Sequence, residues 1–322
     1  MKAIRVHELG GPEVMRLQEI PDPQPAADEV LVRIEAIGVN FIEVYQRKGQ
    51  YQMKLPFTPG REGAGAVVAV GADVATIQIG DRVASEQFAG AYAELAVAKA
   101  NRVMKLPDAV PTEIGAAVML QGLTAHYLTT TTYPLERGDR CLIHAAAGGV
   151  GLLFCQMAKR RGAWLVGTTS TDEKAALARN AGADEIIFYT KQDFVAEVRR
   201  LTGGKGLHVV YDSVGKTTFD GSLDCIARRG MMVLFGQSSG PVPPVDPQLL
   251  NRKGSLFLTR PNLADYVGDP DELAARAVDL LGWVTEGWLH VHVDRAYPLA
   301  EAAEAHRALE SRATAGKVLV RP

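Results

Sequence analysis

The sequence predicts a two-domain α/β protein, in which a doubly wound parallel sheet is combined with a β-rich domain. Two observations lead to this prediction. Residues 141–259 alternate between short apolar runs and helical segments, as parallel strands and their crossover helices do. Residues 1–105 instead hold many short strand-like runs separated by glycine and proline turns, which is typical of a compact barrel-like domain. The length of 322 residues also favours two domains.

The N-terminal third supplies the short strands. Residues 1–8 and 14–19 are expected to form a hairpin, with Gly10-Gly11-Pro12 as its turn. The proline-rich segment 21–25 is expected to be a linker, because proline fits neither a strand nor a helix interior. Further strands are predicted at residues 30–36, 63–70, 92–97 and 102–105, with the turn at 80–83 leading into another.

The spacing of the apolar residues changes from a strand pattern to a helix pattern after residue 111. A helix is expected over residues 112–127, with an interruption at Gly122 left open. Ser170 and Glu173 have the spacing of a capping box at a helix start, and Gly182 stands where that helix would end. Strands are then predicted at 141–143, 164–168, 185–188, 208–212, 231–235 and 255–259, with helices at 149–161, 194–201 and 217–226 between them. The C-terminal part is expected to contain a helix at 270–286, a strand at 293–297, a helix at 300–312 and a strand at 318–320.

A glycine-rich turn follows the first strand of this alternating region. Residues 146–151 read Ala-Ala-Gly-Gly-Val-Gly, directly before a predicted helix. Small residues let the backbone approach a pyrophosphate, and the helix N-terminus directs unpaired N–H groups at that anion. An ordinary tight turn would explain Gly151 but not three glycines in this frame. The pattern therefore favours a dinucleotide-binding site.

Composition limits the other classes of function. A hydrophobic content of 47% with 22% charged residues is ordinary for a globular protein, and the net charge of −2 gives no electrostatic footprint for nucleic acid or an acidic membrane. The cysteines Cys141, Cys155 and Cys225 are dispersed, which argues against a disulfide framework and favours a reducing, cytoplasmic location. Neither a signal peptide nor a membrane span is expected.

The chain resembles the zinc-free quinone oxidoreductases of the medium-chain dehydrogenase/reductase superfamily over nearly its whole length. The resemblance implies a GroES-like catalytic domain made of residues 1–122 and 266–322, around a Rossmann-type dinucleotide-binding domain of residues 123–265. The motifs that carry it lie at residues 38–43, 59–65, 80–83, 122–125, 145–151, 211–215 and 310–314.

The same resemblance argues against zinc. Zinc-dependent relatives place a cysteine at the position of Asn40 and a histidine at that of Arg61. An amide oxygen is a poor zinc ligand, and a guanidinium is cationic. The four-cysteine structural zinc lobe is also absent. Glu62 remains, and a structural salt bridge or turn acceptor is its simpler interpretation. Because a quinone is already electrophilic, its reduction needs alignment with a hydride donor rather than a Lewis acid.

The end of the second strand of the alternating region indicates the cofactor. NAD enzymes usually place an acid there for the ribose 2′-hydroxyl. Here Thr169 and Ser170 follow the strand, and Lys174 lies one turn into the next helix, where a hydroxyl and an ammonium would bind a 2′-phosphate. A solvated helix lysine is the alternative for Lys174. We therefore expect NADPH.

Further site residues are implied by the resemblance. Asn40 and Tyr51 are expected to shape the acceptor pocket, with the Tyr51 phenol offering a hydrogen bond to the quinone; an exposed loop aromatic is the alternative for Tyr51. His144 is interpreted as a satisfied core residue rather than a base. The expected cofactor-binding residues are Asn40, Phe41, Tyr45, Thr124, Gly148, Gly149, Val150, Thr169, Ser170, Lys174, Tyr189, Ser213, Phe235, Gly236, Gln237, Ser238, Leu258, Thr259, Arg260 and Arg312.

The expected activity is therefore NADPH-dependent reduction of quinones without a metal. An enone or 2-enoyl thioester reductase of the same fold is the alternative enzyme. A non-catalytic crystallin-like or RNA-binding role is the alternative from another class, although the near-neutral charge gives RNA binding no support. A homodimer is expected through the edge strand near residues 255–259, because exposed apolar edges tend to be paired or covered.

Overall fold

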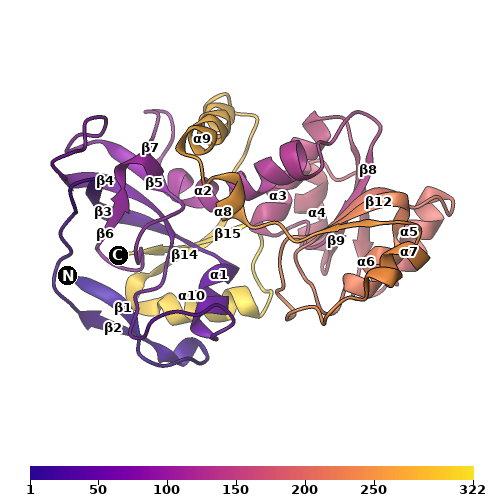
Figure 1. Ribbon diagram of the computed structural model, residues 1–322, viewed down its shortest axis with the longest axis horizontal. Helices are drawn as coiled ribbons and strands as arrows, with labels where there is room; N and C mark the ends of the chain where they lie inside the picture. Colours follow the sequence, from indigo (N-terminus) through magenta and orange to yellow (C-terminus); the bar gives the residue numbers. More distant parts are fainter. The chain divides into compact units, whose positions relative to one another are not determined.

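The computed structural model describes residues 1–322, which divide into two compact units. The first comprises Met1–Leu123 and Gly268–Pro322, and the second comprises Thr124–Val267. Figure 1 shows the chain coloured along the sequence, with both termini in the first unit. Each unit has its own sheet and its own buried core.

The second unit contains a six-stranded parallel sheet in the order β10-β9-β8-β11-β12-β13. From β8 the chain moves outward to one edge and then returns to build the other half, so a topological switch point lies between β8 and β11. The strands are β8 (Arg140–Ile143), β9 (Trp164–Thr169), β10 (Glu185–Phe188), β11 (Leu207–Asp212), β12 (Ile226–Leu234) and β13 (Phe257–Thr259).

Helices cover both faces of this sheet. The two helices that lie between β8 and β10 in the sequence, α3 (Gly149–Arg160) and α4 (Asp172–Asn180), pack together. The two between β10 and β12, α5 (Phe194–Thr202) and α6 (Phe219–Asp224), form the other pair, as right-handed crossovers in opposite directions require (Figure 1). Leu142, Val166 and Val210 are fully buried between the two helical layers. The helices are α3 (Gly149–Arg160), α4 (Asp172–Asn180), α5 (Phe194–Thr202), α6 (Phe219–Asp224), α7 (Pro247–Arg252) and α8 (Leu263–Tyr266).

The first unit is β-rich, as predicted. Its main sheet has the order β14-β15-β3-β4-β5-β7, with β6 also paired to β3, and β1 and β2 form a separate antiparallel pair. The strands are β1 (Lys2–Val6), β2 (Met15–Glu19), β3 (Glu29–Val39), β4 (Glu62–Val70), β5 (Arg82–Ser85), β6 (Leu95–Lys99), β7 (Met104–Lys105), β14 (Val293–Pro298) and β15 (Lys317–Arg321). β15 pairs with β3, so the two ends of the chain build one sheet.

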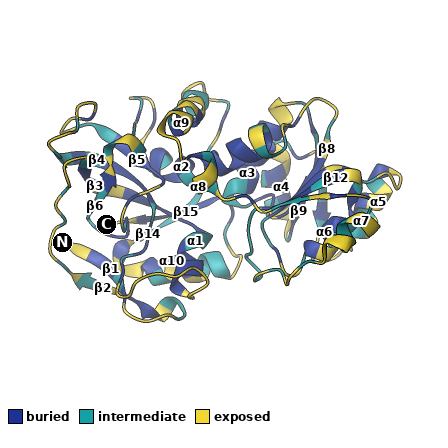
Figure 2. Cartoon of the chain, viewed as in Figure 1, coloured by how far each residue is buried: buried dark blue, intermediate teal, exposed yellow.

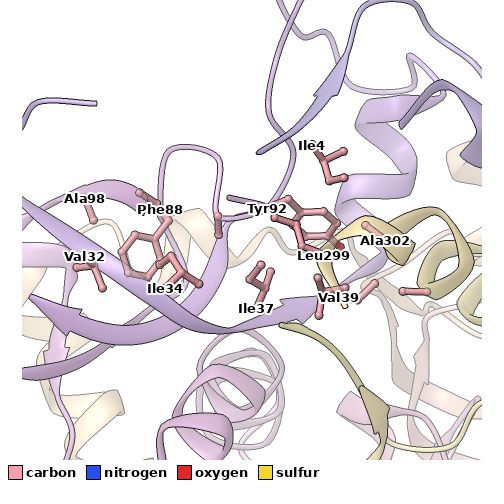
Figure 3. Close-up of a cluster of buried hydrophobic side chains, with 14 of the residues drawn as sticks. Ile4, Val32, Ile34, Ile37, Val39, Phe88, Tyr92, Ala98, Leu299 and Ala302 are labelled. Atoms are coloured by element: carbon pink, nitrogen blue, oxygen red, sulfur yellow. The ribbon is translucent and has the colours of Figure 1, made fainter. Parts of the chain in front are cut away.

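Helices complete the first unit. They are η1 (Pro12–Val14), α1 (Phe41–Arg47), η2 (Ala100–Arg102), α9 (Pro270–Thr285), η4 (Leu299–Glu301) and α10 (Ala302–Glu310). α9 buries Leu273, Ala277 and Leu280 and leaves Val278 69% exposed, which is the pattern of an amphipathic helix. Figure 2 shows the same division, with exposed residues gathered on loops and on one side of the helices. Figure 3 shows the apolar core, in which Ile34, Ile37 and Phe88 are among the labelled side chains.

The helix predicted over residues 112–127 is α2 (Thr112–Tyr127), which runs through Gly122 without interruption and continues into η3 (Leu128–Thr132). Other predicted boundaries were wrong. α4 is capped by the hydroxyl of Thr171, which accepts from the backbone N–H of Lys174, so the predicted capping box at Ser170 lies one residue too early. α6 ends at Asp224, because the chain enters β12 at Ile226. The sequence did not reveal α1, α7 and α8.

Candidate active site

The turn after β8 leads directly into α3. The N-cap of α3 is Gly148, no side chain caps the helix, and its first turn contains no acid. The first N–H groups of a helix have no intrahelical partner, and the helix dipole favours an anion at this end. This turn can therefore bind a phosphate group through its backbone.

Close backbone packing explains the last glycine of the turn. A Cβ at Gly151 would come within 2.6 Å of the carbonyl oxygen of Ala146 and closer still to that of Ala145. Any side chain there would force the turn open. Gly148 and Gly149 are half-buried, and Gly148 donates from its backbone N–H to the Ala145 oxygen at 2.8 Å. Gly151 thus serves the packing of the turn itself, and the close approach of a pyrophosphate to Gly148 and Gly149 stays a prediction.

The end of β9 presents a hydroxyl that the protein itself does not use. Thr169 is 2% exposed, and its Oγ1 is buried with no hydrogen-bond partner. An unsatisfied buried hydroxyl of this kind is uncommon and fits a site completed by a ligand. Ser170 and Lys174 are half-buried beside it in the chain, and Tyr189 is exposed in the turn after β10, with its backbone N–H on the Thr169 oxygen at 3.2 Å. These four expected residues are therefore local to one another.

The loops after β11 and β12 contact each other. The backbone N–H of Ser238 donates to the Ser213 oxygen at 3.1 Å, and a Cβ at Gly236 would lie 2.6 Å from that same oxygen. Because all six strands are parallel, their carboxyl ends share one edge with the glycine turn. Further expected residues at this edge are Phe235, Gln237, Leu258, Thr259 and Arg260. Thr124 is buried in α2 of the same unit, whereas Arg312 is exposed in the first unit, at a φ of 59°.

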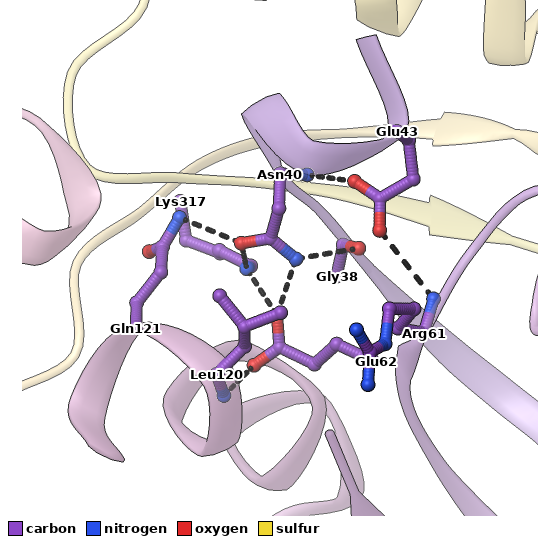
Figure 4. Close-up of polar contacts among 8 residues, drawn as sticks. All are labelled: Gly38, Asn40, Glu43, Arg61, Glu62, Leu120, Gln121 and Lys317. Carbon is purple, nitrogen blue, oxygen red and sulfur yellow. Dashed lines mark hydrogen bonds and ion pairs between the residues drawn. The ribbon is translucent and has the colours of Figure 1, made fainter. Parts of the chain in front are cut away.

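A buried polar cluster occupies the first unit (Figure 4). Asn40 is the N-cap of α1, and its backbone N–H donates to Glu43 Oε2 at 2.8 Å. The Asn40 carboxamide has four hydrogen bonds. Its Nδ2 donates to Glu62 Oε2 at 2.9 Å and to the Gly38 oxygen at 3.2 Å, and its Oδ1 accepts from Lys317 Nζ at 2.9 Å and from Gln121 Nε2 at 3.2 Å.

Those four contacts use the full hydrogen-bonding capacity of an amide. Asn40 is also only 5% exposed. It therefore cannot donate to a bound molecule without giving up a bond to Glu62 or Gly38. Its side chain is a fixed part of the wall of this unit.

Glu62 and Lys317 form a fully buried ion pair at the centre of the cluster. Glu62 Oε1 also accepts from the backbone N–H of Leu120 at 2.7 Å. The prediction that Glu62 serves in a structural salt bridge is therefore confirmed. The sequence-based predictions missed Lys317, for which the one available signal is its place directly before the apolar run Val318-Leu319-Val320 of a strand.

Glu43 lies at the edge of the cluster with a perturbed acidity. Burial raises the pKa of the Glu43 carboxyl to about 7, against the opposing attraction of the Lys317 ammonium. Its Oε1 accepts only a long bond of 3.4 Å from the backbone N–H of Arg61. The ordinary value is near 4.5, so this carboxyl holds a proton in the folded protein over a range where a free one would not.

Aromatic rings on and after α1 lead from the interior to the surface. The Phe41 and Tyr45 ring centroids are 6.0 Å apart, and those of Tyr45 and Tyr51 are 5.8 Å apart. Tyr45 is 9% exposed and Tyr51 is 41% exposed. Tyr51 thus presents part of its ring to solvent while resting on Tyr45. Such a surface can accept a flat aromatic molecule.

No group of three or more His, Cys, Asp or Glu side chains in the chain is arranged to hold a metal ion. No helix has the length and apolar character needed to cross a membrane.

Comparison with known proteins bears on this arrangement. Residues 26–108 match the alcohol dehydrogenase GroES-like domain, and residues 181–320 match a zinc-binding dehydrogenase domain. A quinone oxidoreductase of Pseudomonas aeruginosa is 47% identical over 100% of this chain and 99% of its own length. The chain belongs to the quinone oxidoreductase family of the medium-chain dehydrogenase/reductase superfamily.

Solved structures agree with that membership. An Escherichia coli quinone oxidoreductase complexed with NADPH has a TM-score of 0.98 and 45% identity, and each chain is covered completely. A mycobacterial protein complexed with NADPH has the same TM-score with 49% identity, again with complete coverage of both. The predicted fold class, a parallel Rossmann-type sheet with a GroES-like β-rich part, is confirmed within the family.

Proposed function

We propose that this protein catalyses the NADPH-dependent reduction of quinones by hydride transfer without a metal. The observation that carries the proposal is the uncapped N-terminus of α3, which follows a glycine turn at the switch point of a parallel sheet. That combination is a phosphate-binding device of dinucleotide enzymes. The three relatives at 45–47% identity, which align along nearly their full length, are named quinone oxidoreductases, which supports the acceptor.

We propose that cofactor binding and acceptor binding belong to different domains. We assign cofactor binding to a domain of residues 123–265 and acceptor binding to a domain of residues 1–122 and 266–322. The glycine turn and the orphan Thr169 hydroxyl support the first assignment. The aromatic rings of Phe41, Tyr45 and Tyr51 support the second.

The reduced nicotinamide, when bound, supplies the hydride. The residues of the chain bind and orient the cofactor and the quinone. The N–H groups at the start of α3 would hold the pyrophosphate, and Thr169, Ser170 and Lys174 would hold the 2′-phosphate. Tyr51 lies against the quinone and donates a hydrogen bond to its oxygen as negative charge develops, which lowers the barrier in the transition state. The remaining cofactor contacts are assigned to the other expected residues at the strand ends, to Phe41 and Tyr45 on α1, and to Arg312.

Asn40 has a different role in this proposal. Since its amide is saturated by its own neighbours, it shapes the acceptor pocket as a rigid wall and donates nothing to the substrate. Asn40 and Arg61 also stand at the positions where zinc-dependent relatives have ligands. Elemental analysis of protein purified without added metal should give far less than one zinc per chain. Activity that is lost to a chelator and restored by zinc would contradict a metal-free reaction.

We also propose a homodimer paired through β13. This strand is an edge of the six-stranded sheet, and its Phe257 is 60% exposed. Phe257→Lys should therefore shift the protein toward monomer in light scattering at micromolar concentration. Val278→Lys changes an apolar residue on α9 that is 69% exposed and should leave the mass unchanged. A native monomer, or equal effects of the two variants, would contradict the proposal. The three buried free cysteines support a reducing, cytoplasmic location.

The test of the proposed activity is a stopped-flow record of NADPH oxidation against a panel of quinones, enones and 2-enoyl thioesters. Quinones should be reduced with the highest kcat/KM. Faster reduction of an enone or a thioester would move the assignment to the alternative enzyme class. No oxidation with any acceptor would leave only a non-catalytic role.

A further inference from the structure

A buried chain of side-chain hydrogen bonds crosses the second unit and ends at the glycine turn. Ser222 Oγ donates to Asp212 Oδ2 at 2.9 Å, His144 Nε2 lies 3.0 Å from Ser222 Oγ, and His144 Nδ1 lies 3.1 Å from Thr168 Oγ1. The four residues come from α6, the ends of β11 and β9, and the residue after β8, and none is more than 3% exposed.

The Asp212 end of the chain is fully occupied. Asp212 Oδ1 accepts from the backbone N–H groups of Val214 and Gly215 at 2.7 and 2.9 Å. Its Oδ2 accepts from the hydroxyls of Thr218 and Ser222 at 2.7 and 2.9 Å. A carboxylate can only accept, so the single hydroxyl proton of Ser222 points to Asp212.

The direction of every other bond follows. With its proton committed, Ser222 Oγ must accept from His144, which places the imidazole proton on Nε2. Burial lowers the pKa of His144, so the ring is neutral and its Nδ1 is an acceptor. The Thr168 hydroxyl therefore donates to Nδ1, and its lone pair accepts from the backbone N–H of Ala145 at 3.3 Å. A serine, a histidine and an aspartate thus meet without forming a hydrolytic triad, because the aspartate accepts from the serine and the serine is buried.

Ala145 is the residue at which this chain acts on the turn. It has a φ of 54°, a left-handed conformation that is unfavourable for a residue with a side chain. Its carbonyl oxygen accepts from Gly148 and is the atom that a Cβ at Gly151 would strike. The orientation of the Ala145 peptide therefore sets the shape of the phosphate-binding turn.

We infer that His144 and Thr168 are positioning residues for the dinucleotide: the neutral histidine orients the Thr168 hydroxyl, which holds Ala145 in its left-handed conformation and so preshapes the turn for the pyrophosphate. This inference rests on the proposed function, since it concerns the cofactor of that same site. It extends the predicted core role of His144 to control of a ligand-binding loop. Neither residue touches the cofactor in this assignment.

The test compares three changes at two residues. Thr168→Val keeps the shape of the side chain and removes the hydroxyl, Thr168→Ser keeps the hydroxyl and removes a methyl group, and His144→Leu removes the link to Ser222. NADPH affinity is measured by fluorescence titration, and amide exchange at Ala145 is measured in the protein without NADPH. Thr168→Val and His144→Leu should weaken NADPH about ten-fold, the worth of one hydrogen bond, and speed the exchange of Ala145. Thr168→Ser should bind NADPH as the native protein does.

Val166→Ala is the matched control. Val166 is equally buried on β9 but outside the chain of hydrogen bonds, so this change should lower stability and leave NADPH affinity unchanged. Native affinity and native exchange in both Thr168→Val and His144→Leu would overturn the inference. The inference would also be overturned if Thr168→Ser weakened NADPH binding as much as Thr168→Val does, because a loss of packing would then explain the effect. A native protein that fails to bind NADPH overturns the proposed function itself, whatever the exchange of Ala145 shows.

Discussion

The two units each bury a polar network, and the networks differ in charge. In the first unit the Asn40 carboxamide is held between a buried lysine and a buried glutamate, with Glu43 at the edge. In the network of the second unit Asp212 is the only charged member. Hydrogen bonds through the neutral side chains of Ser222, His144 and Thr168 connect it to the glycine turn. A charged pair stabilises only while both partners remain, whereas a neutral chain chiefly orients. Changes to the first network should therefore appear in stability, and changes in the second unit should appear in cofactor affinity.

The largest effect is expected at the buried ion pair. Lys317→Met leaves the Glu62 carboxylate buried without a cation, which should cost about 3–5 kcal/mol in the free energy of unfolding. Urea denaturation measures this loss. Adding Glu62→Gln to the same chain should recover much of it, since the uncompensated charge is then gone.

A surface pair supplies the control for that change. Lys99 contacts Asp28 at 2.7 Å with its side chain 50% exposed, and Lys99→Met should cost only about 0–1 kcal/mol. A Lys317→Met variant that loses no more than Lys99→Met would remove the distinction between the two networks.

In the second unit the next effect should fall on affinity alone. Lys174→Ala should weaken NADPH by about 1.5–3 kcal/mol, or roughly ten-fold and more, because a charge-assisted contact to the 2′-phosphate is lost. NADH, which has no such phosphate, should bind unchanged. Fluorescence titration with both cofactors measures the difference, and Lys159→Ala at the far end of α3 serves as the control. Equal affinity of the native protein for NADPH and NADH would contradict this assignment.

Glu43 gives the first unit a dependence on pH. Its pKa is about 7 in the folded protein and near 4.5 when free, so the folded state binds more protons between these values. Stability contributed by the neutral form is full below pH 4.5 and falls as the pH rises to about 7. Glu43→Gln should therefore match the native protein near pH 4.5 and exceed it at pH 8 by about 3 kcal/mol. A difference that does not change with pH in urea melts would be the contrary result.

Tyr51 belongs to neither of the two polar networks. It is exposed and rests on Tyr45, so Tyr51→Phe should leave stability unchanged and slow hydride transfer about ten-fold, less than the loss of an obligatory general acid would. Single-turnover kinetics at saturating NADPH and quinone measure this rate, with Tyr51→Ala testing the contribution of the ring. Native rates and native quinone affinity in both variants would show that the acceptor binds elsewhere.

Local patterns predicted much of the fold. The parallel strands alternate with helices, and the strands β8 to β13 lie where short apolar runs occur. The failures have physical reasons. Ser170 and Thr171 are both competent N-caps, and only the geometry of the chain decides between them. α1 is short and follows a strand directly, so it shows too few turns for helical periodicity.

The candidate site was predicted less completely than the fold. The glycine turn is a local motif, and so it could be found. The saturation of Asn40 could not, because Glu62, Gln121 and Lys317 come from three distant parts of the chain. His144 shows the same limit. Its burial was predicted from a strand, but its link to Ala145 runs through Thr168, 24 residues away, and needs the pairing of β8 with β9.

The most direct test of a metal-free hydride transfer is a single turnover with NADPH carrying deuterium at the transferred position of the nicotinamide. Protein treated with a chelator is mixed with saturating quinone, and the loss of NADPH absorbance is followed. We predict that NADPH is oxidised at the same rate as without the chelator, and that deuterium slows this rate. Oxidation that stops after chelation and returns with zinc would contradict the proposed reaction. The same holds for a rate of NADPH oxidation that is equal with and without deuterium.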